Sequence, residues 1–400
     1  MEHLLPFLLL VVAAAAALGL LILLLGLQRV FATAPRLAAA VAEQPAATGS
    51  LTVVIPAYNE AANIAACVSA VLASEPPCSD WSLLVVDDDS TDATADLARE
   101  AAAASPAAAA RFSLLQAGPR PADQRWVGKN WACARAMETV DSEWVLFVDA
   151  DVRLAPTALR RALGQAVAEG ADLFSLAPRL SCGCLAEWMV QPIMATLLGI
   201  GFPIEAANDA ADATAFAAGP FMLFRRSAYA AIGGHAALAA EVVEDLALAR
   251  RIKAAGFRLR YLLGLDAVEL RMYADFAALW EGWSKNWFTG LDRSVPRALG
   301  AAATVGLMFS GPWLLAPAAA ITAVLLPQGR APSLAALALA LLGIVLQLAL
   351  RLWTGHHFAL SPRHWWLMGA GGLVVMALGP TSVWRTLTGR GWTWKGRALA

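Results

Sequence analysis

The chain has 400 residues, of which 59% are hydrophobic and only 15% are charged. Soluble globular domains typically carry about 25% charged residues, so part of this chain is expected to lie in a lipid bilayer. The formal net charge of −1, without a basic stripe in the sequence, argues against nucleic acid as a partner. The cysteines show no CxxC spacing, which favours reduced thiols over a disulfide framework or a zinc site.

The first apolar segment, residues 4–27, contains no charged residue. About 20 apolar residues span a bilayer, so the segment predicts a transmembrane anchor over residues 1–28. A cleaved signal peptide fits less well, because the apolar run is longer than a signal core and no Lys or Arg precedes it. Arg29 and Arg36 follow the segment, and the positive-inside rule therefore places the next domain in the cytoplasm.

A soluble domain of the α/β class is predicted over residues 50–295. Three short apolar runs, residues 51–55, 82–86 and 144–148, each end in polar residues and alternate with helix-forming segments. This order predicts a mostly parallel sheet with helices on both faces. Ligands bind such sheets beyond the carboxyl ends of the strands, so the polar clusters are expected to converge on one crevice.

The first of these polar clusters contains Asn59 and Glu60, which are expected to cap a helix over residues 61–73. The second contains Asp87 and Asp88, followed by a third aspartate. These carboxylates could favour the N-terminus of the next helix, or accept a hydrogen bond from the ring N–H of a pyrimidine base.

The third cluster, Asp149-Ala150-Asp151, places two carboxylates directly after an apolar strand. Oxygen ligands suit a hard divalent cation, which could neutralise a diphosphate leaving group. Such a triplet also occurs as a solvated turn, so it is weak evidence when taken alone.

Two further acidic residues, Glu244 and Asp245, precede a helix and could stabilise its N-terminus. A carboxylate beside apolar surface could instead serve as the base that a transfer to a hydroxyl requires. Gly219 would let the backbone approach a ligand closely, and Lys129 could place a positive charge near a phosphate. His235 is expected to be a polar surface residue in a tight turn, with metal ligation as the alternative.

An aromatic stripe is predicted on one helix face by the spacing of Trp280, Trp283 and Trp287. The stripe could be a membrane-interface belt or a platform beneath an acceptor, and one reading does not exclude the other. Further uncharged runs cover residues 298–329, 331–350 and 365–384. Each is long enough to cross a bilayer, so residues 298–384 predict two or three transmembrane or re-entrant segments.

The tail over residues 385–400 is basic and prefers the cytoplasm, whereas four crossings would leave it on the opposite face. One resolution is that the run over residues 298–329, which contains Pro312 and Pro317, is broken or re-entrant. Three spans and four spans both stay open.

Taken together, these motifs resemble the family 2 glycosyltransferases of the GT-A fold, over about residues 51–287. Their order along the chain is more specific than any single motif. The segments that carry the resemblance are Pro56-Ala57-Tyr58-Asn59-Glu60, Asp87-Asp88 with Ser90-Thr91-Asp92, Asp149-Ala150-Asp151 and Glu244-Asp245.

A second set of segments is similar to a membrane-bound bacterial branch of that family, associated with carotenoid and hopanoid glycosylation. These segments are Trp126-x-Gly128-Lys129-x-Trp131-Ala132, Phe216-Ala217-x-Gly219, Ile232-Gly233-Gly234-His235, Val243-Glu244-Asp245 and Trp394-Lys395-Gly396-Arg397. The resemblance implies a hydrophobic lipid acceptor with a hydroxyl or carboxyl group. It also implies a multi-pass protein of a bacterial inner membrane with a cytoplasmic catalytic domain.

The resemblance further implies an inverting transfer from a UDP- or GDP-sugar with the help of Mg²⁺ or Mn²⁺. It assigns the cation to Asp149 and Asp151, and the catalytic base to Asp245 beside Glu244. Trp283 and Trp287 are assigned to the acceptor or the membrane interface. The residues assigned to the nucleotide sugar are Pro56, Tyr58, Glu60, Asp87, Asp88, Lys129, Asp149 and Gly219.

One segment departs from the family pattern. Where processive or sphingolipid-type members carry Gln-x-x-Arg-Trp, this chain has Trp283-Ser284-Lys285-Asn286-Trp287, and only the final Trp agrees. The departure argues against a processive polysaccharide synthase, as does the small number of spans. A non-catalytic protein with a degenerate sugar-nucleotide site is the third hypothesis, and the intact acids argue against it.

Overall fold

The computed structural model describes residues 4–39, 47–390, 393–394 and 397–398. The chain forms two compact units, each assembled from segments that are separated in the sequence. Unit 1 comprises residues 1–32, 182–201 and 273–392, and unit 2 comprises residues 33–181, 202–272 and 393–400.

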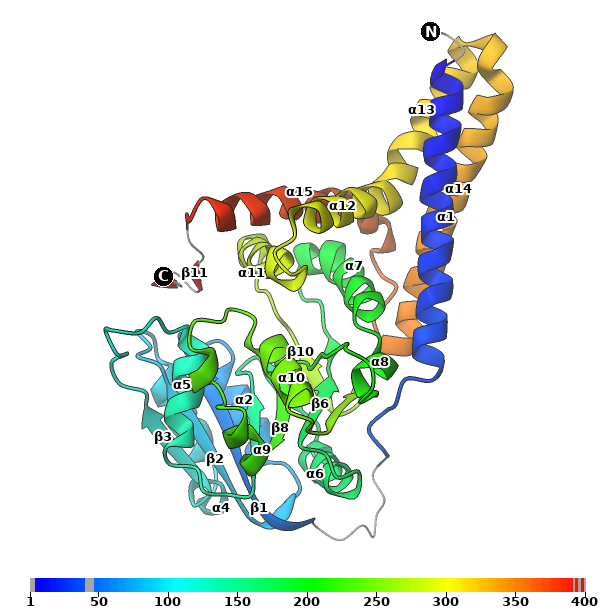
Figure 1. Ribbon diagram of the computed structural model, residues 1–400. Helices are drawn as coiled ribbons and strands as arrows, with labels where there is room; N and C mark the ends of the chain where they lie inside the picture. The colour runs from blue at the N-terminus through cyan, green and yellow to red at the C-terminus, as the bar shows by residue number, and fades with distance from the viewer. Residues whose placement is uncertain (1–3, 40–46, 391–392, 395–396, 399–400) are drawn as a thin grey trace. The chain divides into compact units, whose positions relative to one another are not determined.

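A seven-stranded sheet forms the centre of unit 2, in the strand order β3-β2-β1-β4-β8-β6-β9 (Figure 1). Its strands are β1 (Ala47–Ala57), β2 (Cys78–Asp87), β3 (Phe112–Gln116), β4 (Trp144–Val148), β6 (Leu173–Ala177), β8 (Phe221–Arg225) and β9 (Leu259–Leu263). Strands β3, β2, β1 and β4 are parallel, β8 is antiparallel to β4 and β6, and β9 is parallel to β6. The predicted mostly parallel sheet is confirmed, and the three predicted strands are β1, β2 and β4.

Helices cover both faces of this sheet. One face packs against α2, α3 and α6, and the other packs against α5, α9 and α10. Side chains alternate between the faces along a strand, so Val53 and Ile55 of β1 enter the first core and Val54 enters the second. The helices of unit 2 are α2 (Ile64–Leu72), α3 (Thr94–Ala102), α4 (Pro106–Ala109), α5 (Gly128–Met137), α6 (Ala158–Ala168), α8 (Ile204–Asn208), α9 (Arg226–Ala231) and α10 (Glu244–Ala254).

Unit 2 also contains a three-stranded sheet in the order β5-β10-β7, and a two-stranded sheet of β11 (Thr393–Trp394) and β12 (Arg397–Ala398). The strands of the three-stranded sheet are β5 (Val152–Leu154), β7 (Arg179–Leu180) and β10 (Val268–Leu270). Strand β5 begins directly after Asp151, so the acidic turn after β4 lies between a strand of the large sheet and a strand of the small one.

The start of α2 differs from the sequence prediction. The helix begins at Ile64, and its N-cap residue is Asn63, without a capping side-chain hydrogen bond. The side chains of Asn59 and Glu60 therefore do not cap this helix. Asn59 has a left-handed backbone, with φ of 50°, and its side-chain oxygen accepts a hydrogen bond from Thr91 N at 2.9 Å. The Asn59 side chain instead links the turn after β1 to the turn after β2 by this hydrogen bond.

Unit 1 is helical, and four of its helical segments are long and apolar enough to cross a membrane: Leu4–Ala32, Val295–Leu325, Pro327–Phe358 and Trp365–Leu387. These segments match the four uncharged runs of the sequence. The helices of unit 1 are α1 (Leu4–Ala32), α7 (Leu185–Gly201), α11 (Phe276–Gly290), α12 (Val295–Val305), α13 (Gly311–Leu325), α14 (Arg330–Phe358) and α15 (Met368–Leu387).

A π-helical turn, Gly306–Ser310, interrupts the helix between α12 and α13. Pro312 has no N–H to donate to the carbonyl four residues earlier, which is that of Met308. The buried Gln347 of α14 supplies the missing donor, because its Nε2 lies 3.0 Å from Met308 O and 2.8 Å from Phe309 O. The proline noted in the sequence thus distorts this segment, and a side chain of a neighbouring helix satisfies the released carbonyls.

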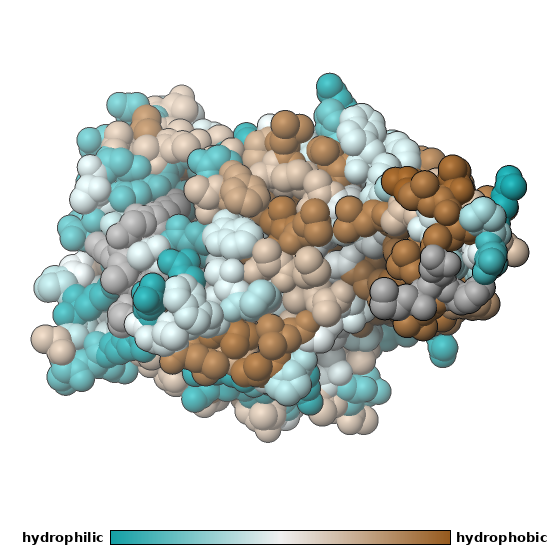
Figure 2. Space-filling model, turned by 90° about the horizontal axis from the view of Figure 1, so that it is seen from above, coloured by the Kyte–Doolittle hydropathy of each residue, from teal (hydrophilic) through white to brown (hydrophobic). Residues whose placement is uncertain are grey.

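Apolar side chains are exposed along the long helices of unit 1. Broad brown areas in the space-filling view of Figure 2 mark hydrophobic surface. Soluble proteins rarely expose large contiguous apolar patches, so these helices suit a lipid environment. Exposed examples are Leu4, Phe7, Val11, Leu18 and Ile22 of α1, Val324 and Leu325 of α13, and Leu341 and Val345 of α14.

Candidate active site

The polar turns after β1 and β2 are hydrogen-bonded to each other. Asn59 N donates to Ser90 Oγ at 3.0 Å, and Glu60 N donates to Thr94 Oγ1 at 2.8 Å. Asp88 N donates to Ala57 O at 2.9 Å. Because β1 and β2 are parallel neighbours, their carboxyl ends lie together, and these bonds fix the two turns as one structure.

Asp87 and Asp88 are both buried at the end of β2. Asp87 Oδ1 accepts a hydrogen bond from Ser90 N at 3.2 Å, and Asp88 Oδ2 pairs with Arg120 Nη2 at 2.5 Å. Neither caps α3, whose first turn begins at Thr94. Pro56 and Tyr58 are buried beside them at the end of β1. No sequence pattern pointed to Arg120, which comes from the long loop between β3 and α5.

The acidic turn after β4 holds Asp149 and Asp151. Asp149 O accepts a hydrogen bond from Val152 N at 3.1 Å, which closes the turn. Among the residues that the structure describes, the buried Oδ1 of Asp151 has no hydrogen-bond partner. Burial, followed by the charges of Asp149 and Glu60, raises the pKa of Asp151 well above its usual value. Burial therefore opposes the ionised form of Asp151 in this turn.

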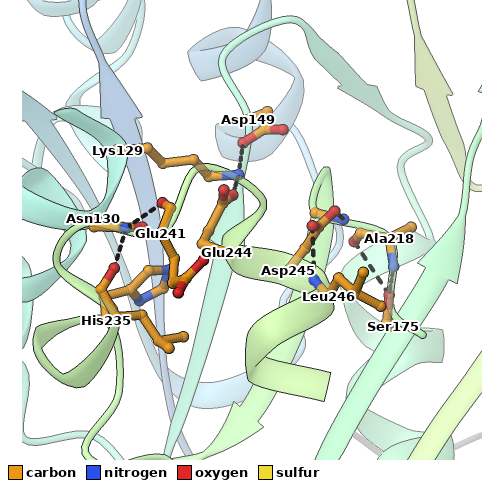
Figure 3. Close-up of polar contacts among 12 residues, drawn as sticks. Lys129, Asn130, Asp149, Ser175, Ala218, His235, Glu241, Glu244, Asp245 and Leu246 are labelled. Carbon is orange, nitrogen blue, oxygen red and sulfur yellow. Dashed lines mark hydrogen bonds and ion pairs between the residues drawn. The ribbon is translucent and has the colours of Figure 1, made fainter. Parts of the chain in front are cut away.

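Lys129, in the first turn of α5, connects this turn to the start of α10. Its Nζ lies 2.7 Å from Asp149 Oδ1 and 2.6 Å from Glu244 Oε1 (Figure 3). Burial disfavours the ammonium, but the two carboxylates outweigh that cost and hold the pKa of Lys129 above its ordinary value. Burial also opposes ionisation of Glu244, yet Lys129 lowers the pKa of that carboxyl. Lys129 and Glu244 are thus an ion pair at neutral pH.

Asp245 lies next to this ion pair, in the first turn of α10 (Figure 3). Its Oδ2 accepts a hydrogen bond from Gly219 N at 3.1 Å, and its Oδ1 accepts one from Leu246 N at 2.7 Å. Burial and the charge of Glu244 raise the pKa of Asp245 to about 6. This value suits a general base at neutral pH, because the carboxylate is ionised and yet basic enough to take a proton.

Gly219 permits this arrangement because it has no side chain. A Cβ at this position would lie 2.9 Å from Asp245 Oδ2. The preceding Ala218 is fixed by Ser175, whose Oγ accepts a hydrogen bond from Ala218 N at 2.8 Å. The group that approaches this backbone is the Asp245 carboxylate, whereas the sequence predicted that a ligand would approach it.

His235 is buried, and the prediction that it is a polar surface residue is wrong. Its Nδ1 shares a hydrogen bond of 2.7 Å with the hydroxyl of Tyr229, and its ring packs edge-on against Phe147. Burial lowers the pKa of His235 to about 3, so the ring is neutral. Its contacts fix the turn before α10 and give no support to a metal ligand.

Asn130 is a buried residue of the site region whose role the sequence did not indicate. Its Nδ2 donates to Leu238 O at 2.6 Å and to Glu241 O at 2.9 Å. Val127 N, from the same segment, donates to Ala239 O at 2.7 Å. The start of α5 therefore holds the loop that leads into Glu244 and Asp245.

Replacing Asn130 by Ala should lower the stability of unit 2 by about 1–3 kcal/mol, because buried carbonyls lose their donor. The change should appear as a lower Tm of the purified protein. Gln124→Ala is the matched control, since it removes an exposed amide from the neighbouring loop. An Asn130→Ala protein as stable as this control would show that the loop does not depend on Asn130.

Trp283 and Trp287 lie in unit 1, on α11, and both are buried. Trp283 Nε1 donates to Gln191 Oε1 at 2.7 Å, and Trp287 Nε1 donates to Ala298 O at 3.1 Å. These contacts show packing within the helices of unit 1, and the acceptor role of the two rings stays a prediction. The motif that begins at Trp394 includes Lys395 and Gly396, which lie outside the described residues.

The oxygen ligands of Asp149 and Asp151 fit a hard divalent cation, and the buried, unpaired Oδ1 of Asp151 is an available ligand atom. Within the described part of the chain, no group of three or more His, Cys, Asp or Glu side chains is arranged to hold a metal ion. Two carboxylates are sufficient for Mg²⁺, which is usually bound by one or two carboxylates together with substrate phosphates.

Part of the chain is similar in sequence to known glycosyltransferases. Residues 52–233 match the family model described as Glycosyl transferase family 2, and this range stops before α10. The chain is similar to a 4,4'-diaponeurosporenoate glycosyltransferase of Staphylococcus aureus (strain MRSA252), with 28% identity over 255 residues. That match covers 63% of this chain and 64% of the relative, which is less than two thirds of the relative's length.

Two solved structures are also similar. One is a mannosyltransferase from Pyrobaculum calidifontis in complex with GDP-Man and Mn²⁺, with 21% identity and a TM-score of 0.49 over 92% of this chain and 98% of that chain. The other is a glucosyl-3-phosphoglycerate synthase from Mycobacterium tuberculosis in complex with Mn²⁺, UDP and phosphoglyceric acid. It shows 18% identity and a TM-score of 0.41 over 62% of this chain and 78% of that chain.

Proposed function

Because the chain carries a glycosyl transferase family 2 domain, we propose that it transfers a sugar from a nucleotide-sugar donor to a membrane lipid, with inversion at the anomeric carbon. The observation that carries this proposal is the Asp245 carboxylate, held by Gly219 N beside the Lys129–Glu244 ion pair. A base, a cation and a set of further acids come together at the carboxyl ends of parallel strands. That is where open α/β sheets bind their ligands.

The donor nucleotide is assigned to the joined turns after β1 and β2. Pro56, Tyr58 and Glu60 line the first turn, and Asp87 and Asp88 line the second. The Asp88–Arg120 pair offers a hydrogen-bond acceptor, the Asp88 carboxylate, beside a hydrogen-bond donor, the Arg120 guanidinium. Uracil and guanine both present a ring N–H next to a carbonyl oxygen, so the pair suits either a UDP-sugar or a GDP-sugar.

The diphosphate is assigned to the end of β4. Asp149 and Asp151 would hold a Mg²⁺ or Mn²⁺ ion, which supplies charge neutralisation for the diphosphate leaving group when it is bound. Lys129, whose ammonium pairs with Asp149, would contact a phosphate oxygen. Gly219 positions the base close to the sugar.

The reaction proposed for Asp245 is general base catalysis. Its carboxylate takes the proton of the acceptor hydroxyl as the hydroxyl oxygen forms a bond to the anomeric carbon. The bond from that carbon to the diphosphate breaks, and the electron pair leaves with the diphosphate. A single displacement from the opposite face inverts the configuration. This role requires an acceptor hydroxyl, because an acceptor carboxylate would be ionised already and would require no base.

The proposed acceptor is a hydrophobic lipid of the carotenoid or hopanoid kind. Four helical segments that are apolar enough to cross a membrane support it, as does the similarity to a diaponeurosporenoate glycosyltransferase. We propose that the protein lies in the inner membrane of a bacterium, with unit 2 in the cytoplasm where nucleotide sugars are available.

The direct test uses the full-length protein in lipid nanodiscs with radiolabelled UDP- and GDP-sugars and a bacterial lipid extract. Label should pass into the organic phase with one of these donors, and more of it with added Mn²⁺ than with EDTA. If no donor is hydrolysed and no sugar is transferred, with Mn²⁺ or with EDTA, the result would contradict an enzymatic function.

The pH profile should report the pKa of Asp245. Only the carboxylate accepts a proton, so kcat/KM should rise with pH, bend near pH 6 and level off above it. Initial rates between pH 5 and pH 8 give this profile, with enzyme returned to pH 7.5 after each exposure as the control for acid damage. A rate that stays constant down to pH 5 would argue against this base.

A further inference from the structure

Lys129 already neutralises Asp149, which is one of the two carboxylates assigned to the divalent cation. Its ammonium lies 2.7 Å from Asp149 and 2.6 Å from Glu244, and its side chain is only 18% exposed. The charges of Asp151 and Glu60 act on the same site, because both carboxyls influence this acidic turn electrostatically. The lysine therefore compensates two carboxylates, and one of them belongs to a proposed metal ligand.

The protein supplies two carboxylates, those of Asp149 and Asp151, to the proposed cation site. The residues that the structure describes offer no cluster of three acidic, histidine or cysteine ligands, so Asp149 and Asp151 must act with oxygens from elsewhere. A diphosphate supplies such oxygens, and it also offers a new partner for an ammonium group. Both features should make cation binding depend on a bound nucleotide-sugar donor.

We propose that Lys129 is a built-in counter-ion that competes with the divalent cation for Asp149, so that the cation binds strongly only together with the donor's diphosphate. This inference rests on the proposed function, because it takes a nucleotide diphosphate as the ligand. Without nucleotide, the lysine compensates Asp149 and keeps the acidic turn stable. With nucleotide, the ammonium contacts phosphate and Glu244, and Asp149 becomes available to the cation.

The test measures Mn²⁺ binding, by calorimetry and by electron paramagnetic resonance, on the full-length protein in phosphatidylcholine nanodiscs with and without UDP or GDP. For the wild type, we expect the nucleotide to tighten Mn²⁺ binding at least tenfold. Lys129→Met should bind Mn²⁺ alone about tenfold more tightly than the wild type and gain less from the nucleotide. Lys129→Arg should behave like the wild type, because it keeps the charge.

Two more variants make the test independent of how well Lys129→Met folds. Arg99→Met removes a positive charge from an exposed ion pair of unit 2 and should leave Mn²⁺ binding unchanged. Glu244→Gln removes the lysine's other carboxylate partner, so the remaining pairing with Asp149 should strengthen. Mn²⁺ alone should then bind more weakly than to the wild type.

Weaker or unchanged Mn²⁺ binding by Lys129→Met would overturn the proposal, as would tighter binding by Glu244→Gln. Wild-type protein that binds Mn²⁺ with nucleotide would still support the proposed function in that case. Protein that binds neither Mn²⁺ nor nucleotide would contradict both the counter-ion role and the proposed function.

Discussion

Replacing Asp245 by Asn should lower kcat by about 100- to 10,000-fold and leave the Kd for the nucleotide sugar close to that of the wild type. The amide has the size of the carboxylate and retains one oxygen for the hydrogen bond from Gly219 N. It cannot take a proton from a hydroxyl. Donor binding is assigned to the turns after β1, β2 and β4, so the change should affect turnover and spare affinity.

The matched control for this substitution is Glu241→Gln, which converts an exposed acid on the loop before α10 into its amide. The control should retain wild-type kcat, because the contact of Glu241 with Asn130 uses its backbone carbonyl. Binding is measured by calorimetry with the donor, and transfer by the appearance of label in lipid. Normal turnover by Asp245→Asn would remove Asp245 from the role of base.

Replacing Asp151 by Asn should change activity and stability in opposite directions. The pKa of Asp151 is raised by burial and by Asp149 and Glu60, so its ionised form weakens the fold at neutral pH. A group with a raised pKa loses its contribution to stability as pH rises, and the neutral amide avoids that loss. The variant should therefore have a higher Tm at pH 7.5.

The same substitution should reduce metal-dependent transfer by roughly 100-fold or more, since a cation ligand supplies several kcal/mol of charge stabilisation. Asp141→Asn is the control, because Asp141 is exposed and precedes β4 at its other end. The two measurements are thermal unfolding and initial rate with Mn²⁺. A variant that is less stable and fully active would contradict both the electrostatic and the ligand assignments.

Much of the fold could be predicted from local patterns. The apolar runs that became β1, β2 and β4 each end in polar residues, and that signal is local in the sequence. The structure confirms the mostly parallel sheet and the apolar helices near both ends of the chain that the sequence predicted. The cap predicted at Asn59 and Glu60 was wrong, because both residues bond to the neighbouring turn after β2.

The contacts within the site could not be predicted, because they join residues that are distant in the chain. The sequence indicated a positive charge at Lys129 but not that it bridges Asp149 and Glu244. His235 looked like a surface residue, since its burial depends on Tyr229 and on Phe147 of a central strand. Asn130 gave no signal, because its partners are backbone carbonyls whose position depends on the whole fold.

The most direct test of sugar transfer to lipid is mass spectrometry of total lipid extracts from cells of one bacterial strain. The cells would carry the wild-type protein, Asp245→Asn, or no copy of the gene. We expect a lipid species, heavier than its precursor by one sugar residue, in wild-type cells alone, with the unmodified precursor accumulating in the other two. Identical lipid profiles in all three would contradict it.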